Sequence, residues 1–257
     1  MNKNGFTLIE IIVALSIGLV IMLAVYSTSE MGQRSSVSIA QKVVTQQDAR
    51  AVLDLMVMEI RMASYNPTSS INNNTWVDSN GAVISAADSK MFMKGIQKAN
   101  ANEIMIEMDL NSNGTVYDQA NTRCYDNTVI YYKFDSNAQT ISRQIGCGNS
   151  LGPLTVILGN ATSQHSGTMV TNNATNPAVK LFTYWGPDID NALADIDITN
   201  NVIANPTRWV PQIRRVIITI VADTELQDQM TRQKRRMTYS TSVIVRNHVL
   251  CPPFPNT

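Results

Sequence analysis

The sequence predicts an α+β fold, in which one long N-terminal helix carries a head built mainly from antiparallel β-strands. Two observations support this prediction. An almost wholly apolar run extends from Phe6 to Tyr26, and apolar residues at helical spacing continue beyond it to Tyr65. Alternating segments bounded by turn residues then recur from Glu103 onward. We therefore expect a sheet packed on the C-terminal half of the helix.

The composition excludes some function classes before any motif is considered. The chain has 257 residues and a formal net charge of zero, so a nucleic-acid binder with a basic face is not indicated. Charged residues make up 16%, below the usual quarter, and Asn, Ser and Thr replace them after residue 66. A surface of neutral polar loops suits an extracytoplasmic protein.

The first residues, Met-Asn-Lys-Asn-Gly, are polar and carry one positive charge at Lys3. The apolar run that follows has the roughly 20 residues needed to span a bilayer as a helix. A secretory signal peptide would be shorter and would end in a small-x-small cleavage site, which this run lacks. A plain signal anchor fits the length but leaves Glu10 unexplained, since a carboxylate in hydrocarbon costs roughly 2.5–3.5 kcal/mol.

The string Gly5-Phe6-Thr7-Leu8-Ile9-Glu10 resembles the type IV prepilin signature. The resemblance implies that a membrane peptidase cuts after Gly5 and that the new N-terminal residue, Phe6, is N-methylated. It also implies a role for Glu10, the acid at the fifth mature position. In a low-dielectric filament core, this carboxylate would neutralise the amine that cleavage creates on a neighbouring subunit. The alternative is that Glu10 lies at headgroup level without a function.

The helix is expected to run from about Phe6 to Tyr65, because Pro67 pushes Asn66 out of the α region. At 1.5 Å per residue its length would be about 90 Å. Beyond the membrane run it carries an apolar stripe that we expect to form head core: Val37, Ala40, Val44, Ala51, Leu55, Met58 and Met62. The predicted divisions are a leader at 1–5, a transmembrane and filament-core half at 6–29, an amphipathic half at 30–66, and a β-rich head at 67–257.

The expected strands of the head are separated by loop signals rich in Asn and Gly. They are Glu103–Met108, Thr128–Phe134, Gln139–Ile145, Leu154–Leu158, Val179–Trp185, Ile213–Ala222 and Met237–Arg246. The second and third are joined by Asp-Ser-Asn-Ala, which predicts a hairpin turn. Residues 160–177 and 186–211 are predicted to be long loops or insertions.

Three segments of the head and helix end extend the resemblance to PilW-type minor pilins. They are Glu59–Tyr65, Ile213–Val216 and the stretch from Arg236 to Asn247. Relatives often have glycine where Ser64 stands, so that position departs from the family. The J-type minor pseudopilin of type II secretion shares the general plan.

The segment from Asp109 to Asp118 resembles the first part of an EF-hand-type calcium loop. Oxygen ligands at alternate positions and a tight-turn glycine suit a hard cation, with candidate ligands at Asp109, Asn111, Asn113, Thr115 and Asp118. The acid expected at loop position twelve is replaced by Ala120, and Asp118 would have to substitute for it. The alternative is a polar Asn-Gly turn between two strands without an ion.

Three cysteines, Cys124, Cys147 and Cys251, lack zinc-ribbon or haem spacing. Cys124 and Cys147 flank the predicted hairpin, and a bulge or loop would bring them within disulfide reach. Cys251 lies in a proline-rich tail and is an alternative partner. No hydrolase, kinase or dinucleotide-binding motif is present. The acid pairs Asp188/Asp190 and Asp195/Asp197 are interpreted as solvated loop residues rather than catalytic acids. The basic run Arg232–Arg236 is interpreted as a solvated turn rather than a binding surface.

The predicted function is that of a non-enzymatic minor pilin that helps to initiate or cap a type IV pilus. The resemblance implies a prepilin peptidase, other major and minor pilins, an assembly platform and the inner membrane as partners. The chain would sit in the inner membrane before assembly and then in the pilus, periplasm or cell surface. The alternatives are a J-like minor pseudopilin, a filament-tip adhesin, or a membrane-anchored extracytoplasmic enzyme or binding domain.

Overall fold

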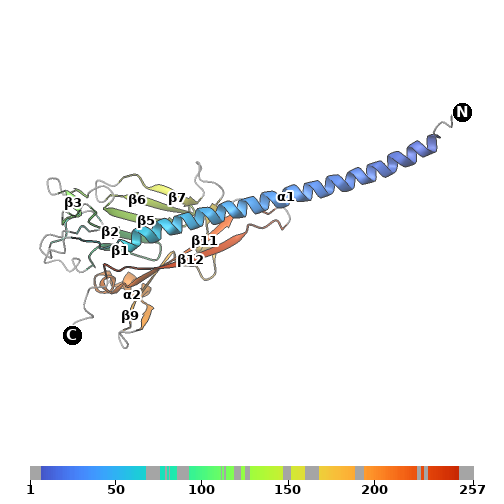
Figure 1. The fold of residues 1–257 in the computed structure, drawn as a ribbon. Helices are drawn as coiled ribbons and strands as arrows, with labels where there is room; N and C mark the ends of the chain where they lie inside the picture. Colours follow the sequence, from blue (N-terminus) through green and yellow to red (C-terminus); the bar gives the residue numbers. More distant parts are fainter. Residues whose placement is uncertain are drawn as a thin grey trace.

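The computed structural model describes residues 7–67, 76–78, 80, 82–85, 93–110, 112, 114–118, 123–124, 128–146, 152–159, 168–188, 194–224, 227–228 and 231–248. Within them, one very long helix enters a head made of two five-stranded sheets and a small two-stranded one. Figure 1 shows the N-terminal half of the helix projecting far from the head, with the C-terminal half lying along the sheets. The predicted α+β class, with a long N-terminal helix and an antiparallel head, is confirmed.

Helix α1 runs from Leu8 to Arg61, so its 54 residues extend about 81 Å. It stops slightly before the predicted end at Tyr65. Ser64 has a φ of 62°, a left-handed conformation that cannot continue a right-handed helix. The chain therefore leaves the helix before Pro67 restricts it.

The first large sheet has the strand order β1-β2-β5-β6-β7, and all its neighbours are antiparallel. Its strands are β1 (Ile96–Ala99), β2 (Glu103–Glu107), β5 (Val129–Asp135), β6 (Thr140–Ile145) and β7 (Thr155–Gly159). The predicted hairpin is confirmed, with Asp135 opposite Thr140. The carboxylate of Asp135 accepts from the N–H groups of Asn137 and Ala138, which fixes the turn. The two-stranded sheet pairs β3 (Tyr117–Asp118) with β4 (Arg123–Cys124).

The second large sheet has the order β10-β9-β11-β12, and β8 also pairs with β11. Its strands are β8 (Thr168–Val170), β9 (Phe182–Pro187), β10 (Asp195–Asp197), β11 (Arg215–Thr224) and β12 (Arg236–Ile244). Short helices α2 (Thr199–Ala204) and α3 (Pro206–Trp209) lie between β10 and β11, next to the 3₁₀ turn η4 (Val210–Gln212). A second 3₁₀ turn, η3 (Asn172–Ala174), follows β8. The prediction that residues 160–177 and 186–211 are only loops was therefore wrong. Strand β8 forms by pairing with the distant strand β11, β10 pairs with its neighbour β9, and the other elements are short helical turns.

The main core joins the helix to both large sheets. The helix face that enters it carries Ala49, Val52, Met56, Ile60 and Ala63, spaced by three or four residues. The predicted apolar stripe was wrong for most of its members, since Val37, Val44 and Met58 are exposed by 48%, 37% and 58%. The buried face is rotated by roughly a third of a turn from that stripe, because the helix is covered on two sides by two sheets.

Candidate functional site

The N-terminal end of α1 is closed by a reciprocal pair of hydrogen bonds. Thr7 is extended, and its hydroxyl accepts from the Glu10 N–H at 3.4 Å. The Glu10 carboxylate in turn accepts from the Thr7 N–H and from the Thr7 hydroxyl, both at 2.8 Å. This capping box turns a negative group toward the positive end of the helix dipole. The Glu10 carboxylate thus lies at the N-terminal end of the described helix, on the side from which the leader enters it in sequence.

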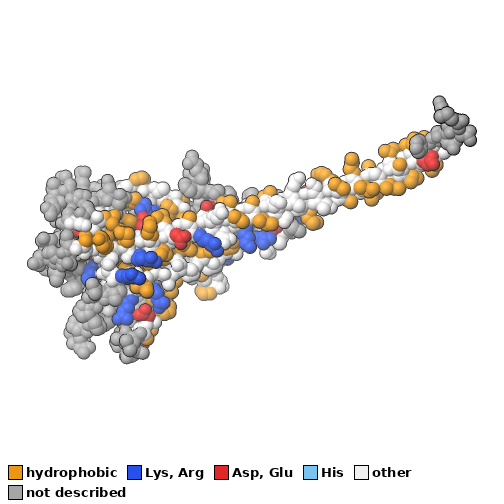
Figure 2. Space-filling view, viewed as in Figure 1, with side chains coloured by type: hydrophobic (Ala, Val, Ile, Leu, Met, Phe, Trp, Pro, Cys, Tyr) orange, Lys and Arg blue, Asp and Glu red, His pale blue; other side chains and the backbone are white. Residues whose placement is uncertain are grey.

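The first half of α1 leaves large apolar side chains in the open. Leu8, Leu15, Leu19 and Met22 are exposed by 78%, 68%, 64% and 76%. The space-filling view shows hydrophobic side chains along the shaft with no other element over them (Figure 2). By length and composition this helix can cross a membrane. A monomeric soluble protein rarely exposes such a continuous apolar surface, so lipid or other helices must cover it.

Glu10 is the single charged residue between Leu8 and Ser29. The hydroxyls of Ser16 and Thr28 donate to the carbonyls of Ile12 and Ala24 within the same helix, at 2.8 and 2.9 Å. Such bonds satisfy hydroxyl groups without outside partners. In this segment, therefore, Glu10 carries the one charge for which a low-dielectric environment would require a partner of opposite charge.

A buried ion pair fastens the head to the shaft. Glu59 on α1 lies almost fully inside the protein and receives two bonds from Arg143 on β6, Nε to Oε2 at 3.1 Å and Nη2 to Oε1 at 2.5 Å. The hydroxyl of Tyr132 on β5 also donates to Glu59 Oε2. Burial and the neighbouring Glu59 charge raise the pKa of Tyr132 far above its usual range, so the phenol stays a donor. The sequence analysis missed this triad.

A second polar junction holds the left-handed residue after the helix. The Ser64 hydroxyl lies 2.8 Å from Nδ1 of His248 and accepts from the Gly95 N–H at 3.1 Å. His248 is completely buried and its Nε2 lies 2.8 Å from the Val210 carbonyl, to which it donates. Burial lowers the pKa of His248 to about 4, so the imidazole is neutral. These contacts explain how serine holds a conformation that favours glycine.

Part of the calcium-type loop is described. Asp109 is 1% exposed, and its Oδ2 accepts from the N–H of Gly114 at 2.9 Å. Its Oδ1 is buried and has no hydrogen-bond partner among the described residues. Gly114 has a φ of 81°, as the tight turn requires. Thr115 is buried next to it. The candidate ligands Asn111 and Asn113 lie outside the described residues, and for Asp118 only the backbone is described.

No acidic cluster supplies a conventional metal site in the described part of the chain. Groups of three or more His, Cys, Asp or Glu side chains placed around a common point are absent from it. Any ion at Asp109 would therefore depend on carbonyl, hydroxyl and amide oxygens for most of its ligands.

The predicted disulfide remains a prediction. Cys124 lies on β4, where it pairs with Tyr117, and nothing is described of its side chain. Cys147 and Cys251 lie outside the described residues.

Two arginines of the basic run Arg232–Arg236 form ion pairs, and so does Asp195 from the acid pair Asp195/Asp197. Arg235 contacts Asp228, and Arg236 forms two bonds of 2.9 Å with Asp223. Asp195 lies 3.5 Å from Arg214 and 3.7 Å from Arg215. The side chains of Arg235 and Arg236 are exposed, as predicted for solvated charges, whereas Asp195 and Asp197 lie on strand β10 rather than in a loop.

The comparisons with known proteins identify the N-terminal segment. Residues 1–26 match the model of the prokaryotic N-terminal methylation motif. No curated protein and no solved structure matches the chain. The match covers the polar leader, the capped start of α1 and most of its exposed apolar face. The motif indicates a type IV pilin-like or pseudopilin-like precursor, with a leader of the kind processed by prepilin peptidase.

Proposed function

We propose that this chain is a minor pilin of the PilW type, a low-copy structural subunit that helps to initiate or cap a type IV pilus. The proposal rests on two features found together. The chain begins with a methylation motif, and the N-terminal half of α1 is not covered by any described part of the head. A structural subunit of a filament uses such a helix twice, first in the bilayer and then among neighbouring helices. An enzyme held by a plain anchor has no need of the motif.

Processing at Gly5 and Phe6 would change the partners of Glu10. Here its carboxylate caps its own helix through Thr7 at an exposed helix end. Cleavage after Gly5 would expose a positive amine on Phe6, which methylation leaves charged. In a dry filament core, pairing this amine with Glu10 of a neighbouring subunit offsets a desolvation cost of several kcal/mol for each charge. Exchange of the cap for the intersubunit pair is therefore favourable only after extraction from the membrane.

The proposal assigns a role to each segment of the chain. Residues 1–5 would be removed, residues 6–29 would lie in the membrane and then in the filament core, residues 30–66 would support the head, and residues 67–257 would form it. The long excursions between β7 and β9 and between β9 and β11 would be bulky in every repeat of a filament. This favours a subunit present in few copies over a major pilin.

Incorporation into filaments tests the role of Glu10. Glu10→Ala should leave the full-length chain in the membrane but lower its amount in sheared filaments at least about tenfold, because the buried amine loses its counter-charge. Glu30→Ala is the matched control, since Glu30 is an exposed acid on the same helix that pairs with Arg34 of its own chain. Equal incorporation of both variants would overturn the proposed pairing.

The main competing role is that of a J-like minor pseudopilin in a type II secretion system. Deletion of the gene distinguishes the two. Loss of surface pili with normal secretion of exoproteins supports the pilus role. Loss of secretion with normal piliation would replace it with the pseudopilin role.

A second candidate function, calcium binding in the head, is favoured by one observation. In the described part of the chain, Asp109 Oδ1 is a buried carboxylate oxygen without a hydrogen-bond partner, and the other oxygen of the same group accepts from the Gly114 N–H. An unpaired buried carboxylate oxygen is costly, and a hard cation would satisfy it. Asn111, Asn113, the Thr115 carbonyl and Asp118 would supply further oxygens by their spacing in the loop.

Thermal unfolding of the detergent-solubilised chain with calcium or with EDTA tests this candidate. At one hundred times its dissociation constant, calcium would stabilise the fold by about 2.7 kcal/mol, which raises Tm by about 5–10 °C. Asp109→Asn should abolish the shift. Asp78→Asn is the control, because Asp78 also accepts two backbone N–H groups in a loop, from Asn80 and Ala82. An unchanged Tm for the unmodified chain would exclude the site.

A further inference from the structure

Strand β12 is the outermost strand of the second large sheet. Nine consecutive residue pairs join it to β11 without a bulge, from Arg236 opposite Asp223 to Ile244 opposite Arg215. Its other side pairs with no strand of the described part of the chain. In Figure 1, β12 runs beside α1 at the margin of the head.

The register shows which backbone groups of β12 face outward. The Val245 N–H donates to the Arg214 carbonyl at 3.0 Å, and the Thr224 N–H donates to the Arg235 carbonyl at 3.1 Å. Antiparallel bonds alternate, so odd-numbered residues of β12 point their N–H and C=O groups toward β11. Even-numbered residues point theirs away from the sheet. The free edge therefore carries the backbone groups of Thr238, Ser240, Ser242 and Ile244, whose side chains are also exposed.

This edge lacks the features that usually protect a sheet margin. From Met237 to Ile244 it has no proline, no charged side chain and no bulge. The other edges of the two large sheets differ. Strands β1 and β7 have four and five residues, and an irregularity interrupts the pairing of each. Strand β10 has three residues.

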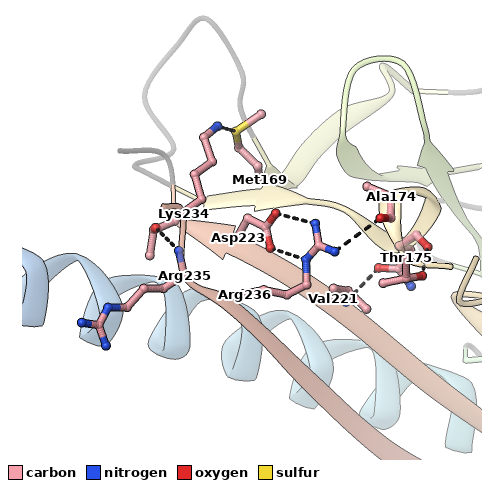
Figure 3. A network of polar contacts seen from close by, with 10 residues as sticks. Met169, Ala174, Thr175, Val221, Asp223, Lys234, Arg235 and Arg236 are labelled. Carbon is pink, nitrogen blue, oxygen red and sulfur yellow. Dashed lines mark hydrogen bonds and ion pairs between the residues drawn. The ribbon is translucent and has the colours of Figure 1, made fainter. Parts of the chain in front are cut away.

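The start of β12 is held firmly in place. Arg236 grips Asp223 of β11 through Nε and Nη2, both at 2.9 Å, and reaches the Ala174 carbonyl with Nη1 (Figure 3). In the middle of the strand, the hydroxyls of Ser240 and Thr219 lie 3.0 Å apart across β11 and β12. Because β12 is already regularly paired and anchored, little conformational entropy is lost from it when a further strand joins the edge.

The side of α1 next to β12 carries the side chains that a strand added to this edge would contact. Ile39, Lys42 and Val43 line a groove with Asp228 and Arg235, the residues that lead into β12. Further along, Arg50 lies close enough to Tyr239 for its charge to act on the phenol, although burial is what raises the pKa of Tyr239.

Basic side chains outnumber acidic ones on this flank, where exposed Asp54 follows Arg50 by one turn of α1. Arg61 follows Arg50 by eleven residues, or three helical turns, and so lies on the same side of α1. No ion pair joins Lys42, Arg50 or Arg61 to an acid among the described residues. Figure 2 shows Lys and Arg side chains along this face of the head and the adjoining helix, with a smaller number of Asp and Glu side chains among them.

We infer that the β12 edge is a strand-addition site for an extended acidic segment of another protein. The segment would extend the sheet through the backbone groups of Thr238, Ser240, Ser242 and Ile244. Its side chains facing α1 would alternate, so that apolar ones cover Ile39 and Val43 and acidic ones meet Arg50 and Arg61. This inference stands apart from the proposed function, since it needs neither the leader nor a filament.

Amide hydrogen exchange in the full-length, detergent-solubilised chain tests the inference. Without a partner, the four outward amides should exchange much faster than the inward amides of Met237, Tyr239, Thr241 and Val243. The probe is a twelve-residue peptide that repeats Val-Ser-Glu-Ser at neutral pH, so that one face of the strand alternates Val and Glu, and Val-Ser-Lys-Ser repeats are the charge control. At one hundred times its dissociation constant, the acidic peptide should slow the outward amides about 100-fold.

Three variants locate the binding. Ser240→Pro removes an outward N–H but no backbone bond to β11, so the sheet should persist while protection by the peptide is lost. Its loss of the hydroxyl contact with Thr219 is matched in Ser240→Ala. Ser240→Ala should bind as the unmodified chain does. Arg50→Glu should weaken the acidic peptide at least about tenfold if this charge faces the added strand.

Several outcomes would overturn the inference. One is protection of the outward amides in the free chain at every concentration, which would mean that its own residues cover the edge. Another is protection that rises with protein concentration alone, which would make a second copy the occupant. A third is equal protection by the acidic and basic peptides, or undiminished binding to Ser240→Pro.

Discussion

Removal of Arg143 should destabilise the protein more than removal of any exposed arginine, because it leaves the Glu59 carboxylate buried without its counter-charge. The side chains of Glu59 and Arg143 are exposed by 10% and 21% and meet through two bonds. Breaking a fully buried pair costs about 3–5 kcal/mol, and the partial exposure of Arg143 reduces this to about 3 kcal/mol. For a chain of this size, Arg143→Met should lower Tm by about 6–12 °C.

A double-mutant cycle makes this prediction specific. Glu59→Met with Arg143→Met replaces the pair by apolar side chains, so the double variant should be more stable than Arg143→Met alone. Thermal unfolding of the full-length chain in detergent, followed by near-ultraviolet circular dichroism, provides the measurement. Arg34→Met is the control, because the Arg34–Glu30 pair is 46% and 44% exposed and should contribute under about 0.5 kcal/mol. Additive costs in the cycle, or equal effects of Arg143→Met and Arg34→Met, would refute the reasoning.

Three further predictions concern the junction after the helix. His248 is neutral in the folded chain, where its pKa is lowered from 6.5 to about 4. Between these pH values the unfolded chain therefore binds more protons than the folded chain. The free energy of unfolding should fall by about 3 kcal/mol as the pH drops from above 6.5 to below 4. Unfolding curves of the unmodified chain and of His248→Gln across this range would check it, since the variant should lose that part of the pH dependence. Gly95→Ala would place a methyl group 2.4 Å from the Ser64 nitrogen and the Glu107 carbonyl oxygen, so it should lower the free energy of unfolding in urea by several kcal/mol. In the control Gly152→Ala, the methyl group lies 3.2 Å from the Ile145 carbonyl oxygen, and the loss should be under about 1 kcal/mol. Ser64→Gly should relieve about 1 kcal/mol of backbone strain but lose two buried hydrogen bonds worth more, so its Tm should fall rather than rise.

The long helix could be predicted because its signals are local. The apolar run, the helical spacing and Pro67 all lie in adjacent stretches of sequence. The face that enters the core could not be predicted, because two sheets cover α1 and bury an arc centred near Met56 rather than the regular stripe through Val44 and Met58. Periodicity alone does not show which of two partly apolar faces will be covered.

The strands divide in the same way. The hairpin of β5 and β6 follows from the turn chemistry around Asp135. Strand β8 has three residues and depends on register with β11, more than fifty residues later. Strand β10 also has three residues, although its partner β9 is close in sequence. Such short segments carry little signal of their own.

The candidate site shows the same contrast. The leader and Glu10 are recognisable from six consecutive residues, and the methylation-motif match covers them. The Glu59–Arg143 pair joins residues 84 apart, so no local pattern announces it. One signal was available, since Glu59 interrupts the apolar spacing between Met56 and Ile60, where a buried acid needs a partner.

The most direct test of the central claim is the intact mass and N-terminal sequence of the chain extracted from the membrane of cells that contain a prepilin peptidase. The account predicts a chain that begins at Phe6, with one additional methyl group on its amine. Gly5→Val should leave the leader attached, as the peptidase then lacks its glycine. A chain that still begins at Met1, or one cut after the apolar run near Tyr26, would contradict the account.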